Sequence, residues 1–161
     1  MSESAEPLSL LAIPSMREIK AVIIAGVIAE SLFELYAWLI SPILFGLSLQ
    51  PSKLVMAITK ITLGIDLPYG AAFVIHALIG SIGFALSVYL IHRVSKQTYL
   101  VAGVITGVLL WFIAQGILAP FIGRAFMMEF GAYTQSSFVG HVGMTVIVGL
   151  ILRRLLQDRS V

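Results

Sequence analysis

Two glutamates, Glu30 and Glu34, stand in the middle of an otherwise apolar run, AVIIAGVIAESLFELYAWLISPILFGL. The run is long enough to cross a bilayer, since a spanning helix needs about 20 apolar residues. A carboxylate near the centre of such a helix costs roughly 2.5–3.5 kcal/mol on insertion scales. Because Trp38 and Ser41 follow at helical spacing, all four side chains are expected on one face. That face should point to protein or water rather than to lipid.

Two histidines follow in later apolar runs, His76 in HALIGSIGFALSVYLI and His141 in HVGMTVIVGLIL. Each stands about two turns inside the start of its run, roughly 10 Å from the helix end at 1.5 Å per residue. Gln115 approaches the same depth from the opposite direction along a third run, and Glu34 lies somewhat deeper. A cluster of these four side chains in the outer half of the membrane is therefore geometrically possible.

Several roles are open for these residues. Two imidazoles at equal depth on different helices can ligate haem b or a metal ion, and with the glutamates they can relay protons. The plainer interpretation is that all of them hydrogen-bond to neighbouring helices and stabilise packing. The sequence contains no nucleophile–base–acid arrangement, phosphate-binding glycine loop or HExxH motif. We therefore expect no enzymatic activity and assign neither a catalytic residue nor a dedicated metal site.

The elements that must position these residues are membrane-spanning helices. The chain has 161 residues, is 59% hydrophobic and has a mean hydropathy of +1.02, more apolar surface than a soluble core of this size could bury. The sequence predicts an all-α polytopic membrane protein with a single four-helix domain over 1–161. The predicted helices cover about 20–47, 70–91, 99–122 and 136–155. With no cysteine, disulfides, thiolate metal sites, Fe–S clusters and covalently attached haem are excluded.

Basic residues mark one set of helix ends and predict the orientation in the membrane. That set comprises Arg17, Lys20, Arg93, Lys96, Arg153, Arg154 and Arg159, against Lys53, Lys60 and Arg124 on the other side. The excess places both termini and the 92–98 turn in the cytoplasm. The residues before Arg17 carry Glu3 and Glu6 without a basic segment or a cleavage site, so we expect the first helix to act as an uncleaved anchor. Basic residues confined to helix ends give no sign of nucleic-acid binding.

Internal similarity predicts that the chain is a duplicated hairpin. The tetrapeptide AGVI at 25–28 recurs at 102–105, and Ser-Pro at 41–42 is matched by Ala-Pro at 119–120. Two out-and-back hairpins would share one orientation, giving a parallel repeat about an axis along the membrane normal. Similar apolar composition is the alternative explanation.

Two further segments have helical patterns of their own. Residues 51–63 place Leu54, Val55 and Ile58 on one face with lysines off it, which predicts a short helix lying in the membrane interface. In the third spanning run a four-residue spacing of small and polar residues indicates a packing seam, with Gln115 as an interhelical hydrogen-bonding group. The members of this seam are Gly103, Gly107, Trp111, Gln115 and Ala119.

The chain resembles a family of small, uncharacterised four-helix membrane proteins of the bacterial inner membrane. The resemblance covers roughly 70–153 and rests on three strings. These are H-x3-G-x3-x-A-L from His76 to Leu86, G-x3-G-x3-W-x3-Q-x4-P-x2-G from Gly103 to Gly123, and S-x3-H ending at His141. It implies a four-helix bundle without an assigned activity. The first helix matches less well, so Glu30 and Glu34 are not part of the resemblance.

The leading functional hypothesis is an accessory subunit of a larger inner-membrane complex, such as a respiratory or other electron-transfer complex. Two features of the sequence favour this hypothesis. The chain has almost no mass outside the membrane, and its intramembrane carboxylates have no cationic partner within the chain. A partner chain would then contact the face with Glu30, Glu34 and Trp38, and Gln115 from the third helix. The first alternative is a haem b- or metal-binding bundle using His76 and His141. The second is a homo-oligomeric proton or cation conduit lined by the two glutamates.

Overall fold

The structure, a computed structural model, describes residues 13–157 of the chain. Within this range every regular element is a helix, and four helices are long and apolar enough to cross a membrane. They cover Met16–Phe45, Tyr69–Ser95, Tyr99–Phe121 and Ala132–Leu156. The predicted all-α class is therefore confirmed, and four helices have the length and apolar composition that the prediction of spanning helices requires. Glu3, Glu6 and Arg159, which entered the prediction of anchor and orientation, lie outside the described residues.

Three of the spanning helices are each interrupted by one π-helical turn, and the fourth is continuous. The first consists of α1 (Met16–Leu35), η2 (Tyr36–Ile40) and α2 (Ser41–Phe45). The second consists of α4 (Tyr69–Leu78), η3 (Ile79–Phe84) and α5 (Ala85–Ser95), and the third of α6 (Tyr99–Phe112), η4 (Ile113–Leu118) and α7 (Ala119–Phe121). The fourth is α8 (Ala132–Leu156); α3 (Ser52–Leu63) and the short 3-10 turn η5 (Phe126–Phe130) lie in the connections.

Two of the π-turns have an evident cause in the sequence. The turn η2 directly precedes Ser41-Pro42, and η4 directly precedes Ala119-Pro120. A proline has no N–H and its ring clashes with the carbonyl four residues earlier, so a regular α-turn cannot continue there. The N–H of Ser41 instead bonds to the carbonyl of Tyr36, and that of Ala119 to the carbonyl of Ala114. Each wider turn adds one residue to the helix and rotates the residues after it about the helix axis.

The first helix begins earlier than its apolar run. Ser15 caps it: the Ser15 hydroxyl accepts from the backbone N–H of Glu18 at 3.3 Å, and the Glu18 carboxylate accepts from the N–H of Ser15 at 2.7 Å. This reciprocal capping box satisfies N–H groups that a helix start leaves unpaired. The S-x-x-E spacing is visible in the sequence and explains why α1 starts at Met16 rather than near residue 20.

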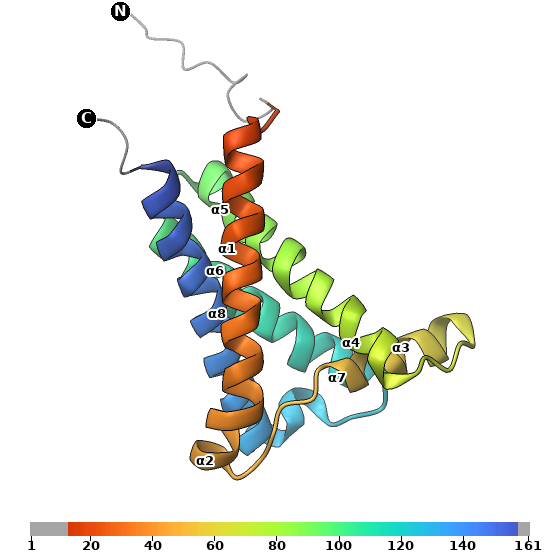
Figure 1. Cartoon of the computed structure of the whole chain (residues 1–161). Coiled ribbons are helices and arrows are strands. Elements are labelled where there is room, and N and C mark those ends of the chain that lie inside the picture. Colours follow the sequence, from red (N-terminus) through yellow and green to blue (C-terminus); the bar gives the residue numbers. More distant parts are fainter. Residues whose placement is uncertain (1–12, 158–161) are drawn as a thin grey trace, which may run out of the picture.

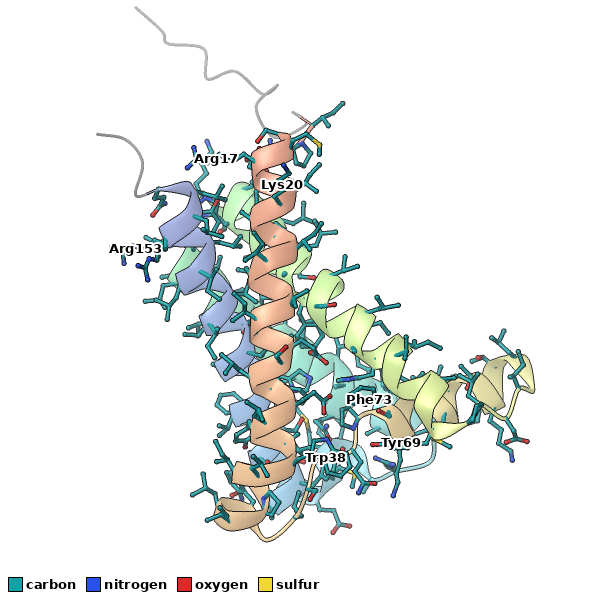
Figure 2. All side chains as sticks on the ribbon, viewed as in Figure 1. Arg17, Lys20, Trp38, Tyr69, Phe73 and Arg153 are labelled. Atoms are coloured by element: carbon teal, nitrogen blue, oxygen red, sulfur yellow. The ribbon has the colours of Figure 1, made fainter. Side chains whose placement is uncertain are left out.

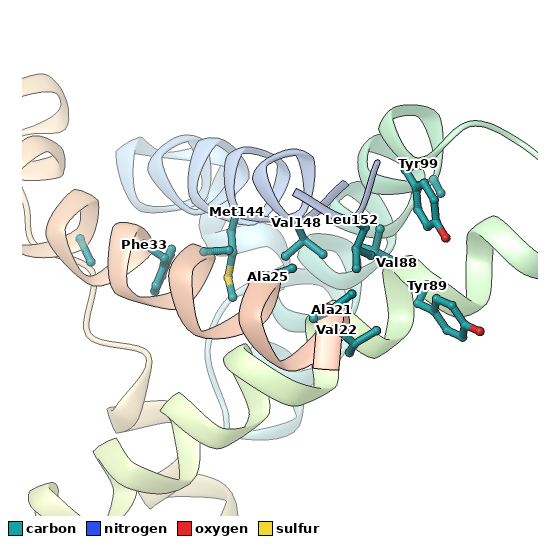
Figure 3. Close-up of a cluster of buried hydrophobic side chains, with 14 of the residues drawn as sticks. Ala21, Val22, Ala25, Phe33, Val88, Tyr89, Tyr99, Met144, Val148 and Leu152 are labelled. Atoms are coloured by element: carbon teal, nitrogen blue, oxygen red, sulfur yellow. The ribbon is translucent and has the colours of Figure 1, made fainter. Parts of the chain in front are cut away.

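The tightest packing joins α1, α6 and α8 with α5 at one end of the bundle (Figure 3). Here the buried side chains are mostly small or of medium size, including Ala21, Ala25, Val88, Val148 and Leu152. Small residues allow helix backbones to approach closely, which is how helices associate where lipid offers no hydrophobic driving force. The described ends of α1 and α8 lie together at this end (Figure 1).

Toward the other end, the second spanning helix leaves α1. It crosses α1 at η3, where a Cβ on Gly26 would lie only 1.6 Å from the carbonyl oxygen of Ser81. Beyond this crossing α4 diverges from α1 and packs against α3 instead (Figure 1). The divergence leaves a cavity of about 300 Å³ between α3 and the spanning helices.

Candidate functional site

Glu30, Glu34 and His76 come together beside the cavity, which Glu30 and His76 line. The Nδ1 atom of His76 lies 3.3 Å from Oε1 of Glu30 and 3.6 Å from Oε1 of Glu34. One nitrogen and two carboxylate oxygens from these residues all lie within 4.8 Å of one another. The glutamates share a face of α1 because they are four residues apart, and α4 brings the imidazole to that face. Both carboxylates thus have an internal neighbour in His76.

The carboxylate of Glu30 also contacts the second spanning helix. It packs against the backbone of η3 at Gly80, where no side chain intervenes. The adjacent Ser81 hydroxyl donates to the carbonyl of Ala77, at the end of α4, at 2.6 Å. A π-turn, which often marks a functional site in a helix, therefore stands beside the most deeply buried acid of the site.

Trp38 and Ser41 were both expected on the same face as the glutamates, but their side chains point in different directions. The indole Nε1 of Trp38 donates to Oε2 of Glu34 at 2.9 Å, while the Trp38 side chain as a whole is 45% exposed. Ser41 is fully buried and bonds to Ser136 on α8 at 2.7 Å and to the Leu47 carbonyl at 2.6 Å. The prediction that Ser41 shares this face is wrong, because the π-turn η2, which contains Trp38 and ends directly before Ser41, rotates the helix.

Gln115 and His141 form a second polar group on the other wall of the same cavity, joined by Ser137. The side-chain amide of Gln115 donates to the Ser137 hydroxyl at 3.0 Å. Nδ1 of His141 lies 2.8 Å from the Ser137 carbonyl oxygen. A carbonyl can only accept, so Nδ1 carries the hydrogen and, in the neutral ring, Nε2 keeps its lone pair. The ring itself lies against Phe84, with centroids 5.5 Å apart.

The cavity connects the two groups. Its polar lining includes Glu30, His76, Gln115, Ser137 and His141. Most of the remaining wall is aliphatic or aromatic, from the spanning helices and from Leu54, Val55 and Ile58 of α3. Concave, largely apolar pockets with a few convergent polar groups are the usual form of a binding site.

Several buried polar atoms of the site have no hydrogen-bond partner among the described residues. Five buried polar atoms have no hydrogen-bond partner in the described chain: both oxygens of Glu30, Oε1 of Glu34, Nδ1 of His76 and Oε1 of Gln115. Buried polar groups without partners cost free energy, and buried charges cost far more. Within residues 13–157 neither glutamate forms an ion pair with a lysine or arginine. The arrangement can therefore hold positive charge, either as protons or as a metal ion.

Sequence reasoning found five of the residues on which this site depends: Glu30, Glu34, His76, Gln115 and His141. The structure brings the first three into direct proximity, and it places the other two on the same cavity. Ser137 and Gly80 were not singled out as site residues, although the S-x3-H and H-x3-G spacings contain them. These two spacings are the sequence features from which Ser137 and Gly80 could have been predicted as site residues.

Comparison of the chain with protein-family models, with curated proteins and with solved structures finds no match.

Proposed function

We propose that this protein binds one divalent transition-metal ion inside the membrane through Glu30, Glu34 and His76. The observation that carries the proposal is the convergence of three buried ligand atoms from two helices within 4.8 Å, none of them satisfied by the described chain. Two ionised carboxylates carry two negative charges, which a divalent ion neutralises. Binding thereby offsets the cost of keeping both acids in a low-dielectric site.

The donor set indicates the class of metal. Imidazole nitrogen and carboxylate oxygen together suit Zn²⁺, Fe²⁺ and Mn²⁺, and a chain without cysteine offers no thiolate to select a softer ion. His141 lines the same cavity with the lone pair of Nε2 available, but the ligand atoms that lie within 4.8 Å of one another come from Glu30, Glu34 and His76 alone among the described residues. The bond from Nδ1 of His141 to the Ser137 carbonyl is the contact that commonly orients a metal-binding imidazole.

The test is the metal content and metal affinity of the purified full-length protein. Metal-depleted protein in detergent is titrated with Co²⁺, whose visible spectrum reports N/O coordination, and then with Zn²⁺, Fe²⁺ and Mn²⁺. We expect one ion per chain, and at least 100-fold weaker binding in both Glu30→Gln and His76→Ala. His92→Ala is the control, since His92 bonds to the Gln97 carbonyl away from the cavity. Equal binding by wild type and both site variants would refute the proposal.

The haem b alternative uses His76 and His141, which line one cavity. Nδ1 of His76 faces two carboxylates, a polar setting that favours a bare cation over a porphyrin. The absorption spectrum of the same preparation decides between them. A Soret band with one haem per chain would replace the metal-ion proposal.

The accessory-subunit hypothesis stays a prediction. It rests mainly on glutamates without an internal partner, whereas His76 lies beside both of them. The conduit hypothesis likewise stays a prediction; most of the cavity wall is apolar, which supports binding better than passage. Purification in mild detergent with mass spectrometry tests the first. Proteoliposome flux of wild type against Glu34→Gln tests the second.

We further propose that the chain lies in the inner membrane of a bacterium with both ends in the cytoplasm. Supporting this, the basic residues Arg17, Lys20 and Arg153 lie at one end of the bundle (Figure 2). α3 then lies in the opposite interface, its apolar residues on the cavity and Lys60 outward, paired with Asp66 at 2.8 Å. The duplicated hairpin is supported by the π-turns before both prolines of the first and third helices.

The resemblance to small four-helix membrane proteins also stays a proposal. The fold it implies agrees with four spanning helices, which many unrelated proteins share.

A further inference from the structure

A second hollow, far from the metal site, lies between the start of α1 and the end of α8. Its volume is about 650 Å³. Three of the residues that line it are basic: Arg17 and Lys20 from α1, and Arg154 from α8. Arg17 and Lys20 are three residues apart and so lie on one side of α1, the side that packs against α8.

Among the residues that the structure describes, these three cations have no acidic partner. Within residues 13–157 no carboxylate lies within ion-pair distance of any of them. The acid nearest in sequence to Arg17 and Lys20 is Glu18, which faces α5, where the Tyr89 hydroxyl donates to its Oε1 at 2.7 Å. Arg17 donates to the carbonyl of Leu155 at 2.8 Å, which ties its guanidinium to the end of α8 and leaves other N–H groups for a ligand.

The rest of the hollow is apolar and continues onto the outer surface of the bundle. Its wall includes Met16, Ala21, Ile24 and Leu155. Ile24 is 47% exposed and Met16 is 67% exposed, so this wall faces the lipid rather than the protein core. A ligand that fits must therefore carry negative charge at one end and hydrocarbon at the other.

We infer that this hollow binds the headgroup of an anionic phospholipid, with its phosphates on the three cations and an acyl chain along Ile24. Basic pockets between the ends of spanning helices are established features of anionic-lipid recognition. Three positive charges match a headgroup with two phosphodiesters, as in diphosphatidylglycerol, better than one with a single phosphate. Arg153, at the same end, does not line the hollow and has no part in this role.

The inference is tested on the full-length protein by native mass spectrometry and by thermal unfolding in detergent. Added probes are diphosphatidylglycerol, phosphatidylglycerol, phosphatidylethanolamine and inorganic phosphate, each alone. We expect tightest binding and the largest rise in Tm with diphosphatidylglycerol, a smaller effect with phosphatidylglycerol, and none with phosphatidylethanolamine. Equal protection by inorganic phosphate would overturn the lipid assignment in favour of a free-phosphate site.

Two variants that remove the same number of charges distinguish a specific lipid site from general attraction between a basic protein and an acidic lipid. In Arg17→Gln/Lys20→Gln/Arg154→Gln we expect at least tenfold weaker binding of diphosphatidylglycerol. The control, Lys53→Gln/Lys96→Gln/Arg153→Gln, removes the same charge elsewhere and should bind within twofold of wild type. The double variant Lys20→Gln/Arg154→Gln keeps the Arg17 contact with α8, should the triple variant fold poorly. An equal loss in the hollow and control variants would overturn the inference.

Discussion

A Cβ atom placed on Gly80 would lie 2.0 Å from Oε2 of Glu30 and 2.5 Å from its carboxyl carbon. The backbone of the second spanning helix is therefore in direct contact with the acid of the first. Only glycine permits this approach, and it occurs inside the π-turn η3, shortly after His76 on the same helix. The contact fixes the direction in which the Glu30 carboxylate points.

Replacing Gly80 by alanine should displace that carboxylate and weaken metal binding. A Cβ cannot be accommodated at 2.0 Å, so the Glu30 carboxylate must leave its present position beside His76. We expect at least tenfold weaker binding, measured by Co²⁺ titration. The matched control is Gly83→Ala in the same π-turn, where the nearest atom to a Cβ is 3.8 Å away. If both variants bind metal as tightly as wild type, metal binding does not depend on the position of the Glu30 carboxylate.

Metal binding should be coupled to proton release. Carboxylates and imidazole ligate a metal only in their deprotonated forms, so protons compete with the ion at this site. We expect the apparent affinity to fall as the pH is lowered from about 8 to about 5.5, by up to about tenfold per pH unit for each proton displaced. Isothermal titration calorimetry in two buffers of different ionisation enthalpy measures the number of protons released. An affinity independent of pH would contradict ligation by these three groups.

The contact that the sequence predicted well joins two residues that lie one turn apart on the same spanning helix. Glu34 and Trp38 are four residues apart, and their side chains are hydrogen-bonded at 2.9 Å. The same reasoning failed for Ser41, three residues further on. That prediction took 3.6 residues per turn along the whole helix, whereas the helix is wider over η2, which ends directly before Ser41. Pro42 signals that the helix is disturbed there, but not that the disturbance takes the form of a π-turn.

The meeting of different helices was harder to predict. Depth alone suggested that His76, Gln115 and His141 could approach one another, and they line one cavity. Depth could not show that His76 turns to the two glutamates while His141 and Gln115 pair with Ser137. That division follows from the close crossing of the first two spanning helices at η3, which sets the angle between them. Such an angle depends on packing between distant residues, which periodicity in one segment does not contain.

Trp38 should act on the metal site through Glu34. Its indole holds Oε2 of Glu34 at 2.9 Å and so orients Oε1 toward His76. Removing a group that orients a ligand typically costs about 10–100-fold in metal affinity, and we expect a loss in that range for Trp38→Phe, by Zn²⁺ competition. Trp111→Phe is the control, because the Trp111 indole bonds to the Thr134 carbonyl at 3.1 Å instead. Equal losses in the two variants would show a general effect of removing tryptophan.

The seam between α6 and α8 should govern stability rather than binding. A Cβ on Gly103 would lie 2.6 Å from the carbonyl oxygen of Thr145, and that atom belongs to the backbone of α8, which cannot rotate aside. Gly103→Ala must therefore push two helices apart along a tightly packed interface. Overpacking of this kind costs about 1–3 kcal/mol.

We expect a clear fall in Tm for Gly103→Ala in detergent, with metal affinity unchanged once the protein is folded. Gly143→Ala provides the comparison on α8, since a Cβ there meets no atom within 4 Å. Alanine also favours helix more than glycine does, so Gly143→Ala should keep or slightly raise Tm. A Gly103→Ala protein as stable as wild type would mean that α6 and α8 are not packed as closely as these distances require.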